Sequence, residues 1–170
     1  SYDGVIANLM STTSFAAQNL SFPGCWAYPD MLEVGCSDGP GGSRDAGLSF
    51  TEARTHFGAW CIVSSPLILS HDTTNDTVTD SIWPIISNVE AIQINQAYAG
   101  ESGALFASSE DKVVLHLFDA ERRGLAAIGD ASIKDIYNTP SFKKEIVVGS
   151  WQQWSKKIDD STVAVFLVNN

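Results

Sequence analysis

Residues 26–31, with the sequence WAYPDM, bring together an aromatic ring, a carboxylate and a thioether in Trp26, Asp30 and Met31. We expect a short parallel strand ending near Trp26 and a turn at Pro29, so these side chains follow the carboxyl end of a strand. Ligands of barrels and open α/β sheets bind at that end. Aromatic faces stack on sugars and carboxylates accept from hydroxyl groups, so the trio suits a carbohydrate. The alternative is that Trp26 and Met31 fill the core and that Asp30 is a turn residue after proline.

Other polar residues give weaker signals. His71 and Asp72 follow an apolar run and are expected on the same rim, where capping of the loop is the favoured role. His56 falls within a predicted helix and is expected to make a structural hydrogen bond, while His116 is expected to face solvent from a strand. The histidines and cysteines lack the spacing of a zinc site, so we predict no metal ligands. No G-x-S-x-G motif occurs, and the glycines of residues 39–42 are not followed by G-K-[ST], so neither a serine hydrolase nor a phosphate loop is indicated.

Three cysteines are too few for a disulfide scaffold. Cys25 and Cys36 bracket a short segment and can form a bridge in an oxidising compartment, with Cys61 left as a small buried residue. Three reduced thiols are the alternative. Asn19 and Asn75 each begin an N-x-[ST] tripeptide, the acceptor pattern for N-glycosylation, which gives weak support to a secretory route.

The chain has 170 residues, a formal net charge of -10 and 44% hydrophobic residues, a mixture typical of globular proteins. Its acidic balance argues against binding to nucleic acid or to an anionic membrane surface. No apolar run approaches the ~20 residues that span a bilayer. The first residues lack a Met and the basic start of a signal peptide, so we expect a mature product or a fragment.

Apolar periodicity predicts helices in the first half of the chain. Apolar residues at helical spacing predict a helix over residues 3–10. Ser49 and Glu52 form an S-x-x-E capping box at the start of a second helix, whose apolar stripe continues to Ser64 and which ends at Pro66.

The apolar run of residues 66–70 predicts a fully buried strand. An amphipathic region over residues 78–94 follows, with breaks expected at Pro84 and Asn88. Residues 1–100 thus alternate helices with short strands, which is typical of βα units around a parallel sheet.

The hydrophobic period changes after a hinge at residues 100–103. Three apolar runs without helices between them predict strands in an antiparallel sandwich or barrel over residues 101–170. They lie at residues 113–118, 146–148 and 163–168, and turn signals lie at residues 119–121, 149–150 and 159–161. A parallel sheet of two strands cannot bury both faces. A closed (β/α)8 barrel takes about 250 residues, so most of such a barrel is expected before Ser1.

Residues 24–35, GCWAYPDMLEVG, resemble the G-x-W-x-x-P-D-M-L-x-x-G segment of the melibiase-type α-galactosidases, glycoside hydrolase family 27. The resemblance continues in register through residues 48–60, 65–72 and 85–96, which look like the family's following barrel helix, last barrel strand and closing helix. It covers residues 20–106 strongly and 150–170 moderately. The family usually has Asn-Asp where this chain has Ala27 and Tyr28.

The resemblance implies a fold of class α/β, with the last two βα units of a partial (β/α)8 TIM barrel over residues 1–100. An incomplete antiparallel β-sandwich domain would follow over residues 101–170. It also implies retaining hydrolysis of terminal α-linked galactose from oligosaccharides, glycolipids or glycoproteins, by two carboxylates ~5 Å apart, with no cofactor and no metal.

The family carries its nucleophile in a K-x-D-type motif and its acid/base in an R-x-x-x-D motif. The R-x-x-x-D motif does not occur here. The K-x-D match at residues 157–159 and the candidate Lys134-Asp135 both lie in the β region, not after a barrel strand. Both catalytic aspartates are therefore expected before Ser1, and the chain alone is expected to be inactive. Asp30 and Met31 match residues of the family's galactose pocket and, with Trp26, are the expected substrate-binding residues. Asp30 is not assigned as the proton donor.

Two other functions remain open. α-N-Acetylgalactosaminidase belongs to the same family, and the residues that choose between the two sugars are expected before Ser1. From another class, the chain could be a non-catalytic sugar-binding or structural module. The resemblance implies an α-galactoside as partner, with no nucleic acid and no membrane, and a secreted or lysosomal/vacuolar location.

Overall fold

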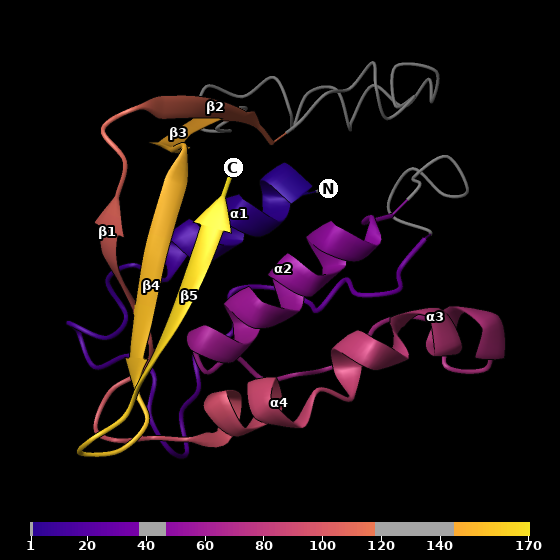
Figure 1. Ribbon diagram of the computed structural model, residues 1–170, viewed down its shortest axis with the longest axis horizontal. Coiled ribbons are helices and arrows are strands. Elements are labelled where there is room, and N and C mark those ends of the chain that lie inside the picture. Colours follow the sequence, from indigo (N-terminus) through magenta and orange to yellow (C-terminus); the bar gives the residue numbers. More distant parts are fainter. Residues whose placement is uncertain (1, 38–46, 118–144) are drawn as a thin grey trace, which may run out of the picture.

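The computed structural model describes residues 2–37, 47–117 and 145–170. Helices precede strands along the chain, as the change of hydrophobic period near residue 100 predicts, and Figure 1 shows the strands beside a diagonal central helix. The elements are α1 (Tyr2–Ser11), α2 (Phe50–Ile62), α3 (Asp76–Ile86), α4 (Val89–Gln96), β1 (Ala104–Ser108), β2 (Lys112–His116), β3 (Glu145–Gly149), β4 (Trp151–Lys157) and β5 (Val163–Asn169). The predicted segments 39–42, 119–121 and 134–135 lie outside the described residues.

The central helix, α2, begins at the predicted capping box. The Ser49 hydroxyl accepts from the Glu52 backbone N–H at 3.3 Å, and the Glu52 carboxylate accepts from the Ser49 backbone N–H at 2.7 Å. These bonds satisfy two backbone donors at the helix start. The end of α2 is fully buried at Trp60, and the chain leaves the helix through Ser64, whose φ is 60°. Helix α2 therefore lies at the centre of the core.

The predicted break at Pro84 is wrong, because Pro84 lies inside α3. Proline removes a single backbone donor close to the end of this helix, and the neighbouring Ile82 and Ile85 remain buried at 7% and 3% exposure. The predicted break at Asn88 is confirmed. The Asn88 side chain accepts from the Ala91 backbone N–H at 2.9 Å and caps the start of α4.

Three antiparallel strands form a sheet in the order β1-β4-β5, and β2 pairs with β3 in a second antiparallel sheet. Alternation along β4 buries Gln152, Trp154 and Lys156, and β4 and β5 contact α2. The opposite alternation on β5 leaves Val165 and Leu167 exposed. The three predicted strands are confirmed within the described residues as β2, β3 and β5. Strand β1 was not predicted, and β4 lies in the range 150–170 that only the family resemblance covers.

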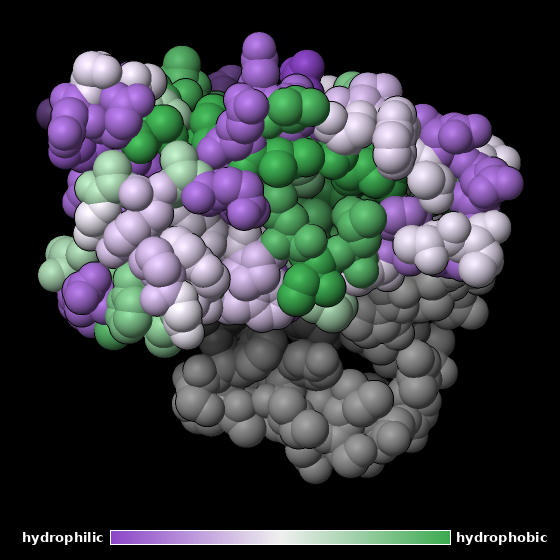
Figure 2. Space-filling model, turned by 90° about the horizontal axis from the view of Figure 1, so that it is seen from below, coloured by the Kyte–Doolittle hydropathy of each residue, from purple (hydrophilic) through white to green (hydrophobic). Residues whose placement is uncertain are grey.

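The prediction of a fully buried strand at residues 66–70 is wrong for this chain. A parallel bridge joins Leu32 to Leu69, but Ile68 and Leu69 are 57% and 40% exposed. This strand has one neighbour within the described residues, and a parallel strand needs cover on both faces to be buried. The strand expected near Trp26 likewise reduces to an antiparallel bridge between Phe22 and Cys25. Figure 2 shows apolar side chains gathered into a patch on one face of the molecule.

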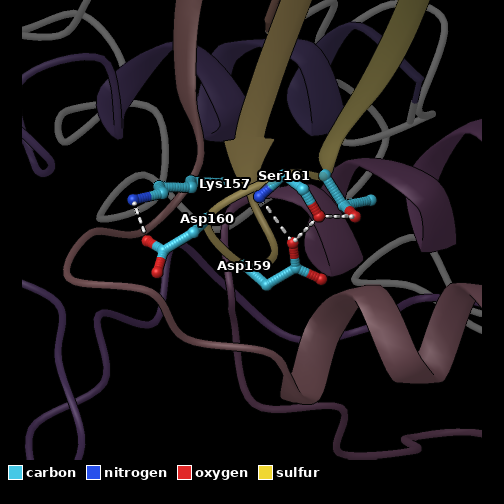
Figure 3. A network of polar contacts seen from close by, with 5 residues as sticks. Lys157, Asp159, Asp160 and Ser161 are labelled. Atoms are coloured by element: carbon cyan, nitrogen blue, oxygen red, sulfur yellow. Dashed lines mark hydrogen bonds and ion pairs between the residues drawn. The ribbon is translucent and has the colours of Figure 1, made fainter.

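The turn between β4 and β5 confirms the turn signal at residues 159–161. The Asp159 carboxylate accepts from the backbone N–H and the hydroxyl of Ser161, at 2.8 and 2.9 Å (Figure 3). These bonds lower the pKa of Asp159. Lys157 pairs with Asp160 at 3.0 Å on the exposed side of the turn (Figure 3).

A buried lysine joins the helical part to the sheet. Lys156 on β4 is 1% exposed and donates to the carbonyls of Ile94 and Asn95 near the end of α4, at 2.5 and 2.9 Å. Asn95 in turn donates to the carbonyls of Trp60 and Ser65, at 3.3 and 2.8 Å. Burial lowers the pKa of Lys156 to about 8, so the side chain keeps its charge at neutral pH, at the end of a helix where carbonyls favour a cation.

Candidate functional site

Three side chains from other parts of the chain bind the backbone of residues 30–33, the site segment. The indole N–H of Trp60 donates to the Asp30 carbonyl at 2.9 Å. The Ser70 hydroxyl donates to the Leu32 carbonyl at 2.6 Å, and the Glu33 backbone N–H donates to Nε2 of His56 at 2.9 Å. Backbone groups of an irregular segment need such partners, and here they also fix its path.

The site segment buries one side chain and exposes two. Leu32 is fully buried, whereas Asp30 is exposed and Met31 is 53% exposed. The Asp30 carboxylate accepts from the Asn8 side chain of α1 at 2.7 Å and from the Met31 backbone N–H at 2.7 Å. A carboxylate can accept about four hydrogen bonds, so Asp30 retains capacity for donors on a ligand.

Trp26, the third residue of the predicted trio, has a different partner. Its ring meets Tyr98, which follows α4, edge to face at 5.6 Å between ring centroids. Within the described ranges, no hydrogen bond or ring contact joins Trp26 to Asp30 or Met31. The structure therefore leaves Trp26 partly exposed, with its ring packed against Tyr98.

The electrostatics of the site follow from burial. Burial lowers the pKa of His56 to about 4, although the Met31 backbone carbonyl favours the charged ring. A ring whose Nε2 accepts a hydrogen bond carries its proton on Nδ1, and that atom is buried without a well-aligned partner. The His56 ring packs against Trp60 at 4.1 Å between centroids. Burial and the nearby Asp30 carboxylate raise the pKa of Tyr28.

His71 and Asp72, the two residues expected on the rim, make hydrogen-bonding contacts with nearby threonines, which fits the structural role predicted for them. His71 is buried and its Nε2 lies 3.2 Å from the Thr79 hydroxyl of α3. Asp72 accepts from the backbone N–H and hydroxyl of Thr74, which lowers the pKa of Asp72. His116 is solvent-exposed as predicted, and its Nδ1 lies 3.1 Å from the Glu145 carboxylate.

The three cysteines are free thiols in the structure, so the Cys25–Cys36 bridge that the sequence allows is not formed. The Cys36 sulfur instead lies 3.4 Å from the Ser70 hydroxyl. Burial raises the pKa of the Cys61 thiol to about 12. Asn19 and Asn75, in the two glycosylation tripeptides, are exposed, and Asn75 also caps α3.

This arrangement suits recognition of a neutral polar ligand. An exposed carboxylate and thioether stand beside the parallel bridge between Leu32 and Leu69 on a backbone that three side chains hold. Across the described part of the chain, no cluster of three His, Cys, Asp or Glu side chains offers a metal site. None of the described helices is long and apolar enough to cross a membrane.

Asp30 lies two residues before the parallel bridge between Leu32 and Leu69, and helices and strands together make this an α/β fold. The family model described as alpha galactosidase A, of the melibiase type, matches residues 3–97. The chain belongs to this family of glycoside hydrolases, and the matched range contains the site segment together with Asn8, His56, Trp60 and Ser70.

Three curated relatives illustrate the similarity. Alpha-galactosidase mel1 of Schizosaccharomyces pombe is 36% identical over 100 residues, which cover 59% of this chain and 20% of the relative. Alpha-galactosidase 3 of Arabidopsis thaliana is 28% identical over 134 residues, 79% of this chain and 24% of the relative. Alpha-N-acetylgalactosaminidase of Gallus gallus is 33% identical over 105 residues, 61% of this chain and 23% of the relative. The chain thus spans about a quarter or less of the length of these relatives.

Sequence reasoning missed the residues that hold the site. His56 was expected to make a structural hydrogen bond, but its partner, the Glu33 backbone, was not foreseen. Trp60 was assigned to an apolar stripe, and Asn8 and Ser70 were not singled out. The available signal was the spacing of His56 and Trp60 by four residues, which places both on one face of α2.

Proposed function

We propose that this chain supplies one wall of the sugar-binding site of a retaining α-galactosidase. Asp30 and Met31 would bind the terminal galactose, with Trp26 as a further substrate-binding residue. The nucleophile and the acid/base would come from residues that precede this segment in the complete enzyme.

The exposed Asp30 carboxylate carries this proposal. Its backbone carbonyl is tied to Trp60 and one of its carboxylate oxygens to Asn8, at 2.9 and 2.7 Å. A hydrogen-bond acceptor fixed in this way recognises sugar hydroxyl groups without having to be ordered on binding. The family match over residues 3–97 supports the choice of an α-galactoside.

The proposed division of the chain follows from the same family. Residues 1–100 would be the last two βα units of a (β/α)8 barrel, and residues 101–170 the start of an antiparallel β-sandwich domain. The parallel bridge between Leu32 and Leu69 and the antiparallel order β1-β4-β5 support these two assignments. Exposure of Ile68 and Leu69 fits strands that pack further in a complete barrel.

The experiment compares two proteins on an aryl α-galactoside. The first is the 170-residue chain alone, which we expect not to turn over substrate. The second is a hybrid in which residues 3–170 follow the part of the S. pombe mel1 protein that precedes its matched segment, and we expect this hybrid to be active. A folded but inactive hybrid, or activity of the chain alone that disappears in Asp30→Asn, would overturn the proposal.

A second candidate function lies within the family, because the Gallus gallus relative is named an alpha-N-acetylgalactosaminidase. In the proposed complete enzyme, the residues that face the substituent at C2 would precede this segment, and their sequence would distinguish the two sugars. Titration of the chain with galactose by calorimetry tests the non-catalytic alternative, for which binding and cooperative unfolding of the isolated chain would be required. A secreted or lysosomal/vacuolar location is also part of the proposal, supported by the exposed side chains of Asn19 and Asn75 in the two N-x-[ST] tripeptides.

A further inference from the structure

Two side chains of helix α2 form hydrogen bonds with the two ends of the site segment, residues 30 and 33. His56 and Trp60 are one helical turn apart, and they are 1% and 0% exposed. Trp60 donates to the first carbonyl of the segment, at Asp30, and His56 accepts from the last N–H, at Glu33. The two bonds therefore bracket the residues that carry the exposed carboxylate and thioether.

The side chains of His56 and Trp60 also pack against each other. Their rings pack edge to face at 4.1 Å between centroids and at an interplanar angle of 68°. Between the two bonded backbone groups, Leu32 is fully buried and its carbonyl accepts from Ser70. The segment is thus bonded to a rigid helix at two points and anchored by a core side chain between them, which leaves little freedom for its backbone.

We propose that His56 and Trp60 are positioning residues of the sugar site, which set the backbone from which Asp30 and Met31 reach the ligand. This inference rests on the proposed function for the identity of the ligand. His56 acts as a neutral hydrogen-bond acceptor and Trp60 as a donor, and neither touches the sugar. A side chain that only filled the core at position 56 would need no acceptor atom.

Hydrogen exchange in the 170-residue chain tests the backbone bonds without any substrate. We expect His56→Leu, which keeps an apolar side chain but removes the acceptor, to raise the exchange rate of the Glu33 amide at least about tenfold, as expected for loss of ~1.4 kcal/mol of protection. His56→Gln supplies an acceptor oxygen and should restore most of the protection. Equal protection in wild type and His56→Leu would contradict the proposal.

Kinetics in the hybrid enzyme test the effect on sugar binding. Contacts made equally in the ground state and the transition state appear in KM, so His56→Leu and Trp60→Phe should raise KM and the inhibition constant of galactose about tenfold, with a smaller change in kcat. His56→Gln should stay within about threefold of wild type.

Phe57→Leu is the matched control, because Phe57 is buried on α2 next to His56 and has no hydrogen-bonding group. It should lower stability while leaving KM unchanged. If His56→Leu and Trp60→Phe leave KM unchanged as well, or if His56→Gln is as impaired as His56→Leu, the positioning role is wrong. An inactive wild-type hybrid would overturn the proposed function alone, because hydrogen exchange still decides whether the bonds position the segment.

Discussion

The indole N–H of Trp60 donates a 2.9 Å hydrogen bond to the backbone carbonyl of Asp30. This bond joins a fully buried side chain of the central helix to the residue with the exposed carboxylate of the site. The position of that carboxylate therefore depends on the packing of the core. Each prediction below tests part of this connection between the core and the site.

Stability should depend on pH through His56. Its pKa is lowered from 6.5 to about 4 by burial, so the unfolded chain takes up a proton first as the pH falls. The contribution of the neutral His56 ring to the free energy of unfolding is therefore present above pH 6.5. It is lost between pH 6.5 and pH 4 and amounts to about 3 kcal/mol. Urea unfolding at several pH values measures this loss.

His56→Gln is the control for the pH effect, because glutamine does not titrate. The unfolding free energy of wild type minus that of His56→Gln should fall by about 3 kcal/mol between pH 7 and pH 4, since carboxylates titrate alike in both proteins. A difference that stays constant over this range would show that His56 is not buried as a neutral ring.

Adjacent lysines on β4 should differ sharply in their contribution to stability. Lys156→Met leaves two carbonyls near the end of α4 without their buried donor, so we expect a loss of about 2 kcal/mol in the free energy of unfolding. Lys157→Met removes only an exposed ion pair and should leave the unfolding midpoint unchanged. Equal effects of the two substitutions in thermal unfolding would contradict the assigned contacts.

Two glycines at the contact between helix α2 and the β part should tolerate a methyl group to different degrees. A Cβ at Gly103 would collide with the Ile62 carbonyl, which is backbone, whereas a Cβ at Gly58 would lie 2.6 Å from the Phe166 ring. A ring can move more easily than a backbone carbonyl, so Gly103→Ala should lower the unfolding midpoint more than Gly58→Ala. Circular dichroism melting curves measure both, and the reverse order would argue against the described packing.

The capping box at the start of α2 should contribute measurably to stability. Ser49→Ala removes the hydroxyl that accepts from Glu52, with an expected cost of about 1 kcal/mol. Thr51→Ala, one residue inside the helix, serves as the control and should not destabilise, because alanine is the better helix former. Denaturant unfolding of both variants would refute the assignment if Ser49→Ala were as stable as wild type.

Local sequence signals predicted the elements that depend on local chemistry. The capping box at Ser49, the helix cap at Asn88 and the turn at Asp159 each arise from a side chain bonding a backbone group a few residues away, so the sequence contains the whole interaction. The predicted break at Pro84 was wrong because a proline near a helix end removes only one backbone hydrogen bond. The burial of Ile82 and Ile85 outweighs that loss.

Long-range contacts could not be predicted in the same way. The bonds from Trp60 to Asp30 and from Lys156 to Asn95 join residues 30 and 61 positions apart, and no periodicity specifies such pairs. The buried strand predicted at residues 66–70 required neighbours on both sides, while the described residues provide one at Leu32. Asp30 and Met31 were proposed as site residues because residue type and family pattern coincide there, whereas their supports, Asn8 and Trp60, have no distinctive residue pattern.

The most direct test of the central claim is the effect of Asp30→Asn on kcat/KM of the hybrid enzyme with an aryl α-galactoside. Asp160→Asn is the matched control, because this aspartate lies exposed in the turn between β4 and β5 (Figure 3). If the Asp30 carboxylate binds the sugar, Asp30→Asn should lower kcat/KM by at least about 100-fold, as expected for loss of a charged hydrogen-bond acceptor, and Asp160→Asn should have no effect. A folded Asp30→Asn hybrid with wild-type kcat/KM would contradict the assignment of this segment to the sugar site.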